Sequence, residues 1–181
     1  MSSIVDFYRG DAPDYLGRTL DEILSWDDER LEDVHNYIQV LFPLGEYSFF
    51  NIRAPLIDEA TIAAFQGDER LRANLARSFE RLLAFYGMRY DPRTGKVELA
   101  VDFVEKALNW LKPYNHNYRR ITRILRSLAS LGLPDRARAF FDCLATLYAS
   151  QREEIGPVAF AYWQEAIGIR PTSHGSLHND E

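Results

Sequence analysis

The chain has 181 residues, of which 46% are hydrophobic and 13% aromatic, and its formal net charge is −6. This composition fits one globular domain and excludes an intrinsically disordered chain. The single cysteine, Cys143, excludes an internal disulfide and a thiolate metal site, and its apolar helical surroundings predict a buried, inert thiol. No stretch approaches the ~20 apolar residues of a membrane span and no signal-peptide pattern opens the chain, so we expect a soluble, cytoplasmic protein.

Helical patterns begin soon after the N-terminus. Thr19 and Glu22 form a capping box, which predicts a short helix over residues 20–25. An acid-rich first turn then predicts a single longer helix over 28–42, which ends before Pro43 because proline lacks the amide hydrogen that a helix needs.

The connection over 43–57 is unusually long for a compact helical domain. It contains several aromatic and aliphatic side chains, so we expect it to pack on the helices as irregular backbone. Its buried backbone groups then need side-chain partners, and Asn51 is one candidate.

Caps and apolar periodicity predict the rest of the fold. Asp91 to Gly95 is a turn signal, so residues 88–99 form a hairpin or a loop. The aperiodic end, 168–181, is expected to be a flexible tail. We therefore predict an all-α fold, a single domain over 1–167 with about seven or eight helices. The predicted later helices are 58–67, 68–86, 102–111, 116–131, 134–150 and 156–167.

The helix over 116–131 has two different faces. One face carries an apolar stripe that a packed helix requires, namely Ile121, Ile124, Leu125 and Leu128. The other carries four arginines within eight residues, which packing does not require. Three interpretations stay open: internal pairing with acidic groups or loop carbonyls, a site for an anion or an acidic peptide, and contact with nucleic acid, which the net negative charge makes unlikely.

A polar stripe also runs along the predicted helix over 28–42. Asp28, Glu32, His35 and Gln39 lie at positions i, i+4, i+7 and i+11. Glu-x-x-His pairs of this kind serve in helix-bundle metal sites, but such sites need two pairs and further carboxylates. Only one pair is present, so we expect no metal and no cofactor.

Two segments of the chain resemble the conserved domain of the opioid growth factor receptor family. The first reads Leu-Glu-Asp-Val-His-Asn-Tyr-Ile-Gln-Val-Leu-Phe-Pro over 31–43, and the second reads His-Asn-Tyr-Arg-Arg-Ile-Thr-Arg-Ile-Leu over 116–125. Between them, in the family's order, stand Asn51, Ala54-Pro55 and Phe85-Tyr86-Gly87. The match spans roughly residues 7–144.

This resemblance implies a mostly helical domain. In animals it also implies a receptor for the peptide Met-enkephalin that is associated with the nucleus. It assigns no catalytic residue. Side chains in the family motifs and on the two polar faces make up the expected ligand site, which is Glu32, His35, Gln39, Asn51, His116, Asn117, Arg120 and Arg123.

We therefore expect the segments 28–42 and 116–131 to pack together, so that their polar edges form one constellation. The leading prediction is a non-enzymatic module that binds a peptide or a small anionic ligand. One alternative is an enzyme with His35 or His116 as general base and an arginine anion clamp. Others are a purely structural polar network and a nucleic-acid-associated protein. The last helix, apolar nearly all round, leaves homodimer formation open.

Overall fold

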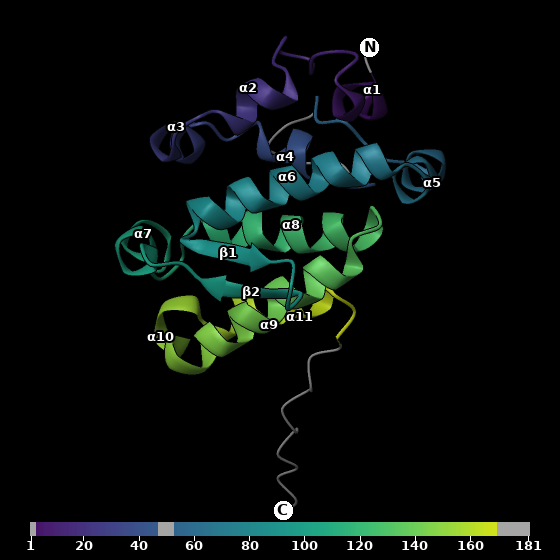
Figure 1. Ribbon diagram of the computed structural model, residues 1–181. Coiled ribbons are helices and arrows are strands. Elements are labelled where there is room, and N and C mark those ends of the chain that lie inside the picture. The colour runs from purple at the N-terminus through teal and green to yellow at the C-terminus, as the bar shows by residue number, and fades with distance from the viewer. Residues whose placement is uncertain (1–2, 47–52, 170–181) are drawn as a thin grey trace, which may run out of the picture.

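The computed structural model describes residues 3–46 and 53–169 of the chain. These residues confirm an all-α fold with a small hairpin insert near 88–99 (Figure 1). They contain eleven helices rather than seven or eight, because several helices are only four to six residues long. The predicted tail over 168–181 lies almost wholly outside the described residues.

The helices and the two strands follow one another along the chain in a simple order. They are α1 (Ile4–Arg9), α2 (Leu20–Leu24), α3 (Asp28–Asp33), α4 (Ile38–Leu41), α5 (Glu59–Gly67), α6 (Glu69–Phe85), β1 (Met88–Asp91), β2 (Lys96–Leu99), α7 (Phe103–Trp110), α8 (Asn117–Ser130), α9 (Pro134–Ser150), α10 (Arg152–Ile155) and α11 (Pro157–Ala166).

The long helices begin where the sequence signals predict. The Asp68 side chain accepts hydrogen bonds from the first-turn amides of α6, and Pro134 stands at the start of α9. The apolar stripe of α8 is fully buried, and this helix packs against α9 and α11. The antiparallel hairpin pairs Met88 with Leu99 and packs between α6 and α9.

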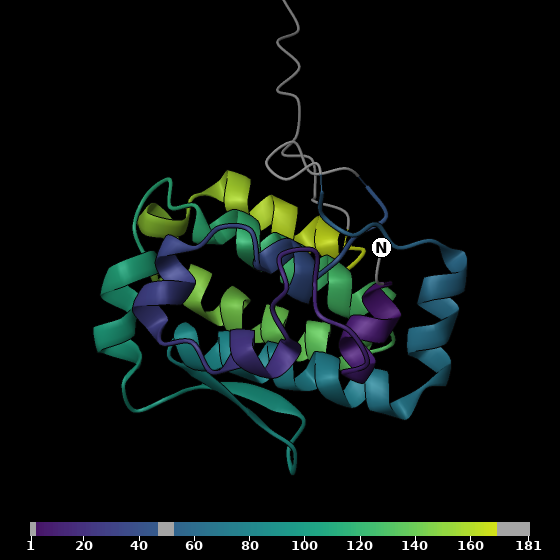
Figure 2. The ribbon, with the colours of Figure 1, turned by 90° about the horizontal axis from the view of Figure 1, so that it is seen from above.

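Three layers position the candidate site. Helices α1 to α4 form one layer, which lies over α6 and α8 (Figures 1 and 2). Helices α9, α10 and α11 lie on the opposite side (Figure 1). Because the stripe of α8 faces the core, its arginine-rich face is turned toward the segment between α3 and the 43–57 connection.

The predicted single helix over 28–42 is wrong. Helix α3 ends at Asp33, Val34 is extended with φ −85° and ψ 122°, and α4 begins only at Ile38. The short helices α1 and α10 were not expected from periodicity, because four to six residues do not establish a helical period.

The connection over 43–57 is described only in part. Leu44 forms an isolated bridge with Leu56, and the Ile57 amide donates to the Leu44 carbonyl at 3.3 Å. Ile57 is buried, in agreement with a connection that packs on the helices as irregular backbone. Asn51 lies outside the described residues.

Helix α11 is divided between the core and the surface. Trp163 is fully buried, whereas Val158 and Tyr162 are exposed. The structure includes no partner chain, so homodimer formation stays a prediction. Among the described helices, none has the length and apolar character needed to cross a bilayer.

Candidate functional site

Arg120 of α8 holds the irregular backbone that follows α3. Its Nη1 donates to the Leu31 carbonyl at 2.9 Å, and its Nη2 donates to the carbonyls of Glu32 and Val34 at 3.1 and 3.3 Å. The last carbonyls of a helix have no partners within the helix. The guanidinium of Arg120 supplies those partners, so it takes the place of the next helical turn.

Two further side chains of α8 repeat this contact along the chain. Arg123 Nη1 donates to the Phe42 carbonyl at 3.1 Å, and Ser127 Oγ donates to the Pro43 carbonyl at 3.1 Å. Arg120, Arg123 and Ser127 lie three or four residues apart and therefore on one face of the helix. The predicted contact between 28–42 and 116–131 is thus present, and it is made largely to backbone carbonyls.

A polar cluster joins the start of α8 to Glu32. The Glu32 carboxylate lies 3.3 Å from His116 Nε2 and accepts from Asn117 Nδ2 at 3.1 Å. Arg120 Nη1 lies 3.6 Å from the same carboxylate, and the Arg120 and Asn117 side chains are buried. Asp28, the first residue of the predicted polar stripe, instead pairs with Arg81 at 2.8 Å.

Arg120 also determines the tautomer of His35. Its Nη2 lies 2.9 Å from His35 Nδ1. Nη2 has two hydrogens for its three acceptors, so it shares one of them; because a guanidinium can only donate, Nδ1 accepts and the proton of the neutral imidazole is on Nε2. The His35 and His116 rings stand perpendicular, with their centroids 5.3 Å apart.

Burial lowers the pKa of His116 below its ordinary value of 6.5. The positive charge of Arg120 and the neighbouring His35 lower this pKa further, and the Glu32 carboxylate opposes them. His116 is therefore neutral at pH 7, and its Nε2–H can donate to Glu32.

A cleft of about 780 Å³ opens between these segments. Five of the predicted ligand residues line it, namely His35, Gln39, His116, Arg120 and Arg123. Glu32 and Asn117 do not line the cleft. They are hydrogen-bonded to each other, and Asn117 accepts from Arg120, which does line it. The other lining residues are Asp33, Val34, Asn36, Ile38, Leu44, Glu46, Arg119, Thr122 and Arg126.

Three of the lining residues, His116, Arg119 and Arg126, are exposed to solvent. Glu46, from the 43–57 connection, binds Arg126 through both carboxylate oxygens at 2.5 and 3.2 Å. Arg126 is one of the four arginines that the sequence places on this face of α8, whereas Glu46 is not among the predicted site residues. No local pattern distinguishes Glu46 from any other surface acid.

Gln39 lies at the inner end of the cleft, and only 7% of its surface is exposed. Within the described residues its Oε1 has no hydrogen-bond partner. Buried amide oxygens usually have one, so Gln39 is an unusual feature of this wall.

The cleft carries few groups for covalent or metal chemistry. Its described lining contains no serine or cysteine, and the Thr122 hydroxyl donates to the Tyr118 carbonyl at 3.0 Å. In residues 3–46 and 53–169, no group of three histidine, cysteine, aspartate or glutamate side chains is placed to hold a metal ion. The arrangement is suited to hydrogen bonding and charge pairing.

Comparison with known proteins shows which family the chain resembles. The family model described as "Opioid growth factor receptor (OGFr) conserved region" matches residues 5–173. Two opioid growth factor receptors, from Rattus norvegicus and Homo sapiens, are 40% and 39% identical to the chain over 121 and 137 residues, which are 65% and 71% of it. The opioid growth factor receptor-like protein 1 of Xenopus tropicalis is 36% identical over 119 residues, or 64% of the chain.

The match covers only 20% of each of the two receptors and 23% of the receptor-like protein. No solved structure matches the chain. The family model nevertheless covers almost the whole chain, including both motifs that build the cleft. The chain therefore belongs to the family defined by the opioid growth factor receptor conserved region.

Proposed function

We propose that this chain is a non-enzymatic binding module and that its cleft takes a peptide or other anionic ligand. The observation that carries this proposal is the row of Arg119, Arg123 and Arg126 along one wall of a 780 Å³ cleft. The chain as a whole has a net charge of −6, so this concentration of positive charge is local. A cationic wall in a negatively charged protein attracts anions to one place.

The histidines favour binding over catalysis. A general base needs a free lone pair within reach of the substrate. Nδ1 of His35 accepts from Arg120 and its Nε2 carries the proton, so His35 has no such lone pair. His116 is held by Glu32 beside the cleft, but no described nucleophilic side chain accompanies it.

The relatives favour a peptide among anionic ligands. Two of them are named as receptors for the opioid growth factor. The chain spans about a fifth of their length, so their ligand is a proposal here and not a property of this chain. The candidate ligand residues are those that line or support the cleft, together with Asn51.

Binding can be measured by isothermal titration calorimetry with three probes: Met-enkephalin, sodium pyrophosphate and a short DNA duplex. We expect a saturable signal with a peptide or with pyrophosphate that weakens as salt is raised. Arg123→Gln should weaken it by about tenfold, because a charge-assisted hydrogen bond is worth roughly 1.5–3 kcal/mol.

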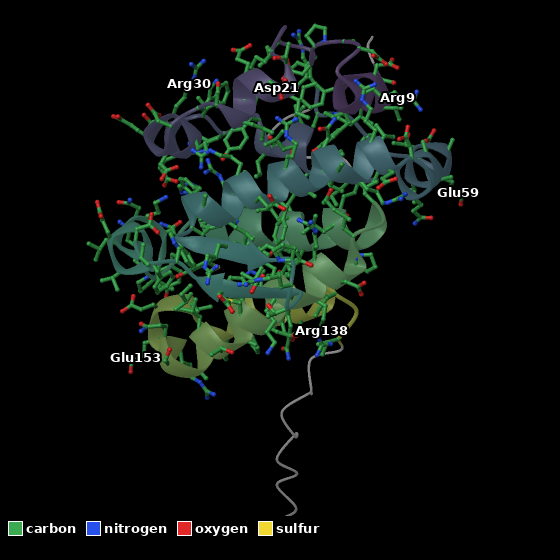
Figure 3. The ribbon with its side chains drawn as sticks, in the orientation of Figure 1. Arg9, Asp21, Arg30, Glu59, Arg138 and Glu153 are labelled. Atoms are coloured by element: carbon green, nitrogen blue, oxygen red, sulfur yellow. The ribbon has the colours of Figure 1, made fainter. Side chains whose placement is uncertain are left out.

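Arg138→Gln is the matched control. Arg138 lies on α9, far from the layer that carries Arg30 and Asp21 (Figure 3), and it pairs locally with Asp142 at 2.9 Å. If no probe binds, or if the Arg123 and Arg138 variants bind alike, the proposal is wrong. Tightest binding to the duplex would instead support the nucleic-acid alternative.

A further inference from the structure

The cleft is rich in hydrogen-bond donors, and its lining also includes the acceptors of Asp33, Gln39 and Glu46. Arg119, Arg123 and Arg126 contribute guanidinium groups, which carry five N–H donors each and no acceptor atom. His35, from the segment between α3 and α4, is exposed and also lines the cleft, and Arg120 fixes its proton on Nε2. Within residues 3–46 and 53–169, no group accepts a hydrogen bond from this Nε2–H. A ligand that pairs with these donors must therefore present acceptors to the arginines and to His35.

The chain itself shows which acceptor the arginine row takes. Glu46 is a side-chain carboxylate on a non-helical segment, and it binds Arg126 with both oxygens. This two-pronged contact uses the planar shape that carboxylates and guanidinium groups share. Glu46 is thus an internal example of a peptide carboxylate held at one end of the row.

The spacing of the row matches an extended peptide. Arg119 and Arg123 are four residues apart on α8, which corresponds to a rise of about 6 Å. Alternate side chains of an extended chain point to the same side about 6.6 Å apart. Two acidic residues separated by one residue can therefore reach both arginines, whereas two adjacent acidic residues point to opposite sides.

In the same cleft, Val34, Ile38 and Leu44 provide apolar lining. This lining suits the side chain between the two acidic residues of an extended peptide. Such a peptide presents its backbone carbonyl groups roughly perpendicular to its side chains, so a carbonyl can accept from His35 while the carboxylates face the arginines.

We propose that the cleft is specific for an extended acidic peptide segment with carboxylates at alternate positions. The two carboxylates bind Arg119 and Arg123, just as the Glu46 carboxylate binds Arg126 at the end of the arginine row. A backbone carbonyl of the segment accepts from His35 Nε2–H, which makes His35 a specificity-determining residue. This inference rests on the proposed function and adds the class and spacing of the ligand.

Two peptides of identical composition test the spacing, namely acetyl-Gly-Glu-Val-Glu-Gly-amide and acetyl-Gly-Glu-Glu-Val-Gly-amide. Blocked ends leave only the side-chain carboxylates as anions. We expect the alternating peptide to bind the full chain at least about fivefold more tightly at low salt, because it places both carboxylates on one side. Equal affinities would overturn the spacing.

Two variants test His35. His35→Gln keeps an N–H donor at a similar reach and should bind the alternating peptide within about threefold of wild type, whereas His35→Phe should lose about tenfold. Long-range ¹H–¹⁵N NMR of the imidazole should show the Nε2–H tautomer. Unchanged binding by the Phe variant, or an Nδ1–H tautomer, would overturn the role of His35.

Pyrophosphate separates this inference from the proposed function. If pyrophosphate binds the cleft and neither peptide does, the peptide class is overturned and anion binding stands. If neither pyrophosphate nor either peptide binds, both proposals fail. Binding of the alternating peptide that Arg123→Gln abolishes and Arg138→Gln preserves supports both.

Discussion

Arg120 and Leu31 are 89 residues apart in the chain, yet the Arg120 guanidinium donates to the Leu31 carbonyl at 2.9 Å. The same side chain donates to two further carbonyls, those of Glu32 in the last turn of α3 and of Val34 just after it. A helix over 28–42 would satisfy these carbonyls with its own amides. Here a distant arginine replaces those amides, and the backbone is free to turn toward the cleft.

Replacing Arg120 should destabilise the fold. Arg120→Met leaves three backbone carbonyls without this donor, and we expect a loss of about 3–5 kcal/mol in the free energy of unfolding. Arg120→Lys should recover only part of this loss, because one ammonium group cannot reach all three carbonyls. Urea unfolding at pH 7.5 measures both. Arg138→Met is the control and should change the free energy by less than about 0.5 kcal/mol; equal effects would contradict the role of Arg120.

Glu46→Gln should strengthen anion binding in the cleft. The Glu46 carboxylate occupies Arg126, so its removal makes a cation available to an incoming anion. We expect pyrophosphate to bind about two- to fivefold more tightly, with stability changed by less than about 0.5 kcal/mol because the pair is exposed. Glu80→Gln is the matched control, since Glu80 pairs with Arg136 at 2.6 Å outside the cleft. Unchanged or weaker binding by the Glu46 variant would refute this prediction.

The stability of the fold should fall as the pH drops through the ordinary titration range of histidine. The pKa of His116 is lowered in the folded chain, by burial first and then by Arg120 and His35. Below pH ~6.5 the unfolded chain binds this proton more readily than the folded chain, so acidification favours unfolding. His116→Gln removes this contribution. Urea unfolding at pH 7.5 and 5.5 should therefore show a larger acid-induced loss for wild type than for the variant, and an equal loss would count against the lowered pKa.

Cys143 should react slowly with thiol reagents. Burial raises the pKa of its thiol to about 11, against an ordinary value of 9.0, so the thiolate fraction at pH 7.5 falls by about two orders of magnitude. Alkylation by iodoacetamide should accelerate by at least that factor when the chain is unfolded in urea. Comparable rates in the native and unfolded states would show that the thiol is accessible and ordinary.

Much of the helical fold could be predicted because its signals are local. The Asp68 cap, the proline at the start of α9 and the buried stripe of α8 all act within a few residues of where they stand. The polar faces of 28–42 and 116–131 could also be assigned to one constellation, since both carry more polar groups than a packed helix needs. His35, Gln39, His116, Arg120 and Arg123 do line one cleft.

Other parts of the site could not be predicted. The break at Val34 depends on a donor from a helix 86 residues further along the chain. The role of Glu46 depends on its meeting Arg126 of α8, and the tautomer of His35 depends on which of its ring nitrogens faces Arg120. These contacts are long-range, and residue patterns along a chain carry no information about their geometry.

Residue order along the chain was thus enough to predict the helical class, most of the capped helices and the family. The helices depend on residue order over a short span, where backbone propensity and apolar periodicity act directly, and the family depends on motifs that recur in order along the chain. Where the helix after Asp27 ends, and which arginines face solvent or hold backbone carbonyls, became known only from the three-dimensional arrangement. Those outcomes depend on groups that are distant in the chain but close in space. Buried carbonyls need hydrogen-bond donors, and which donor reaches each carbonyl depends on how all the helices pack.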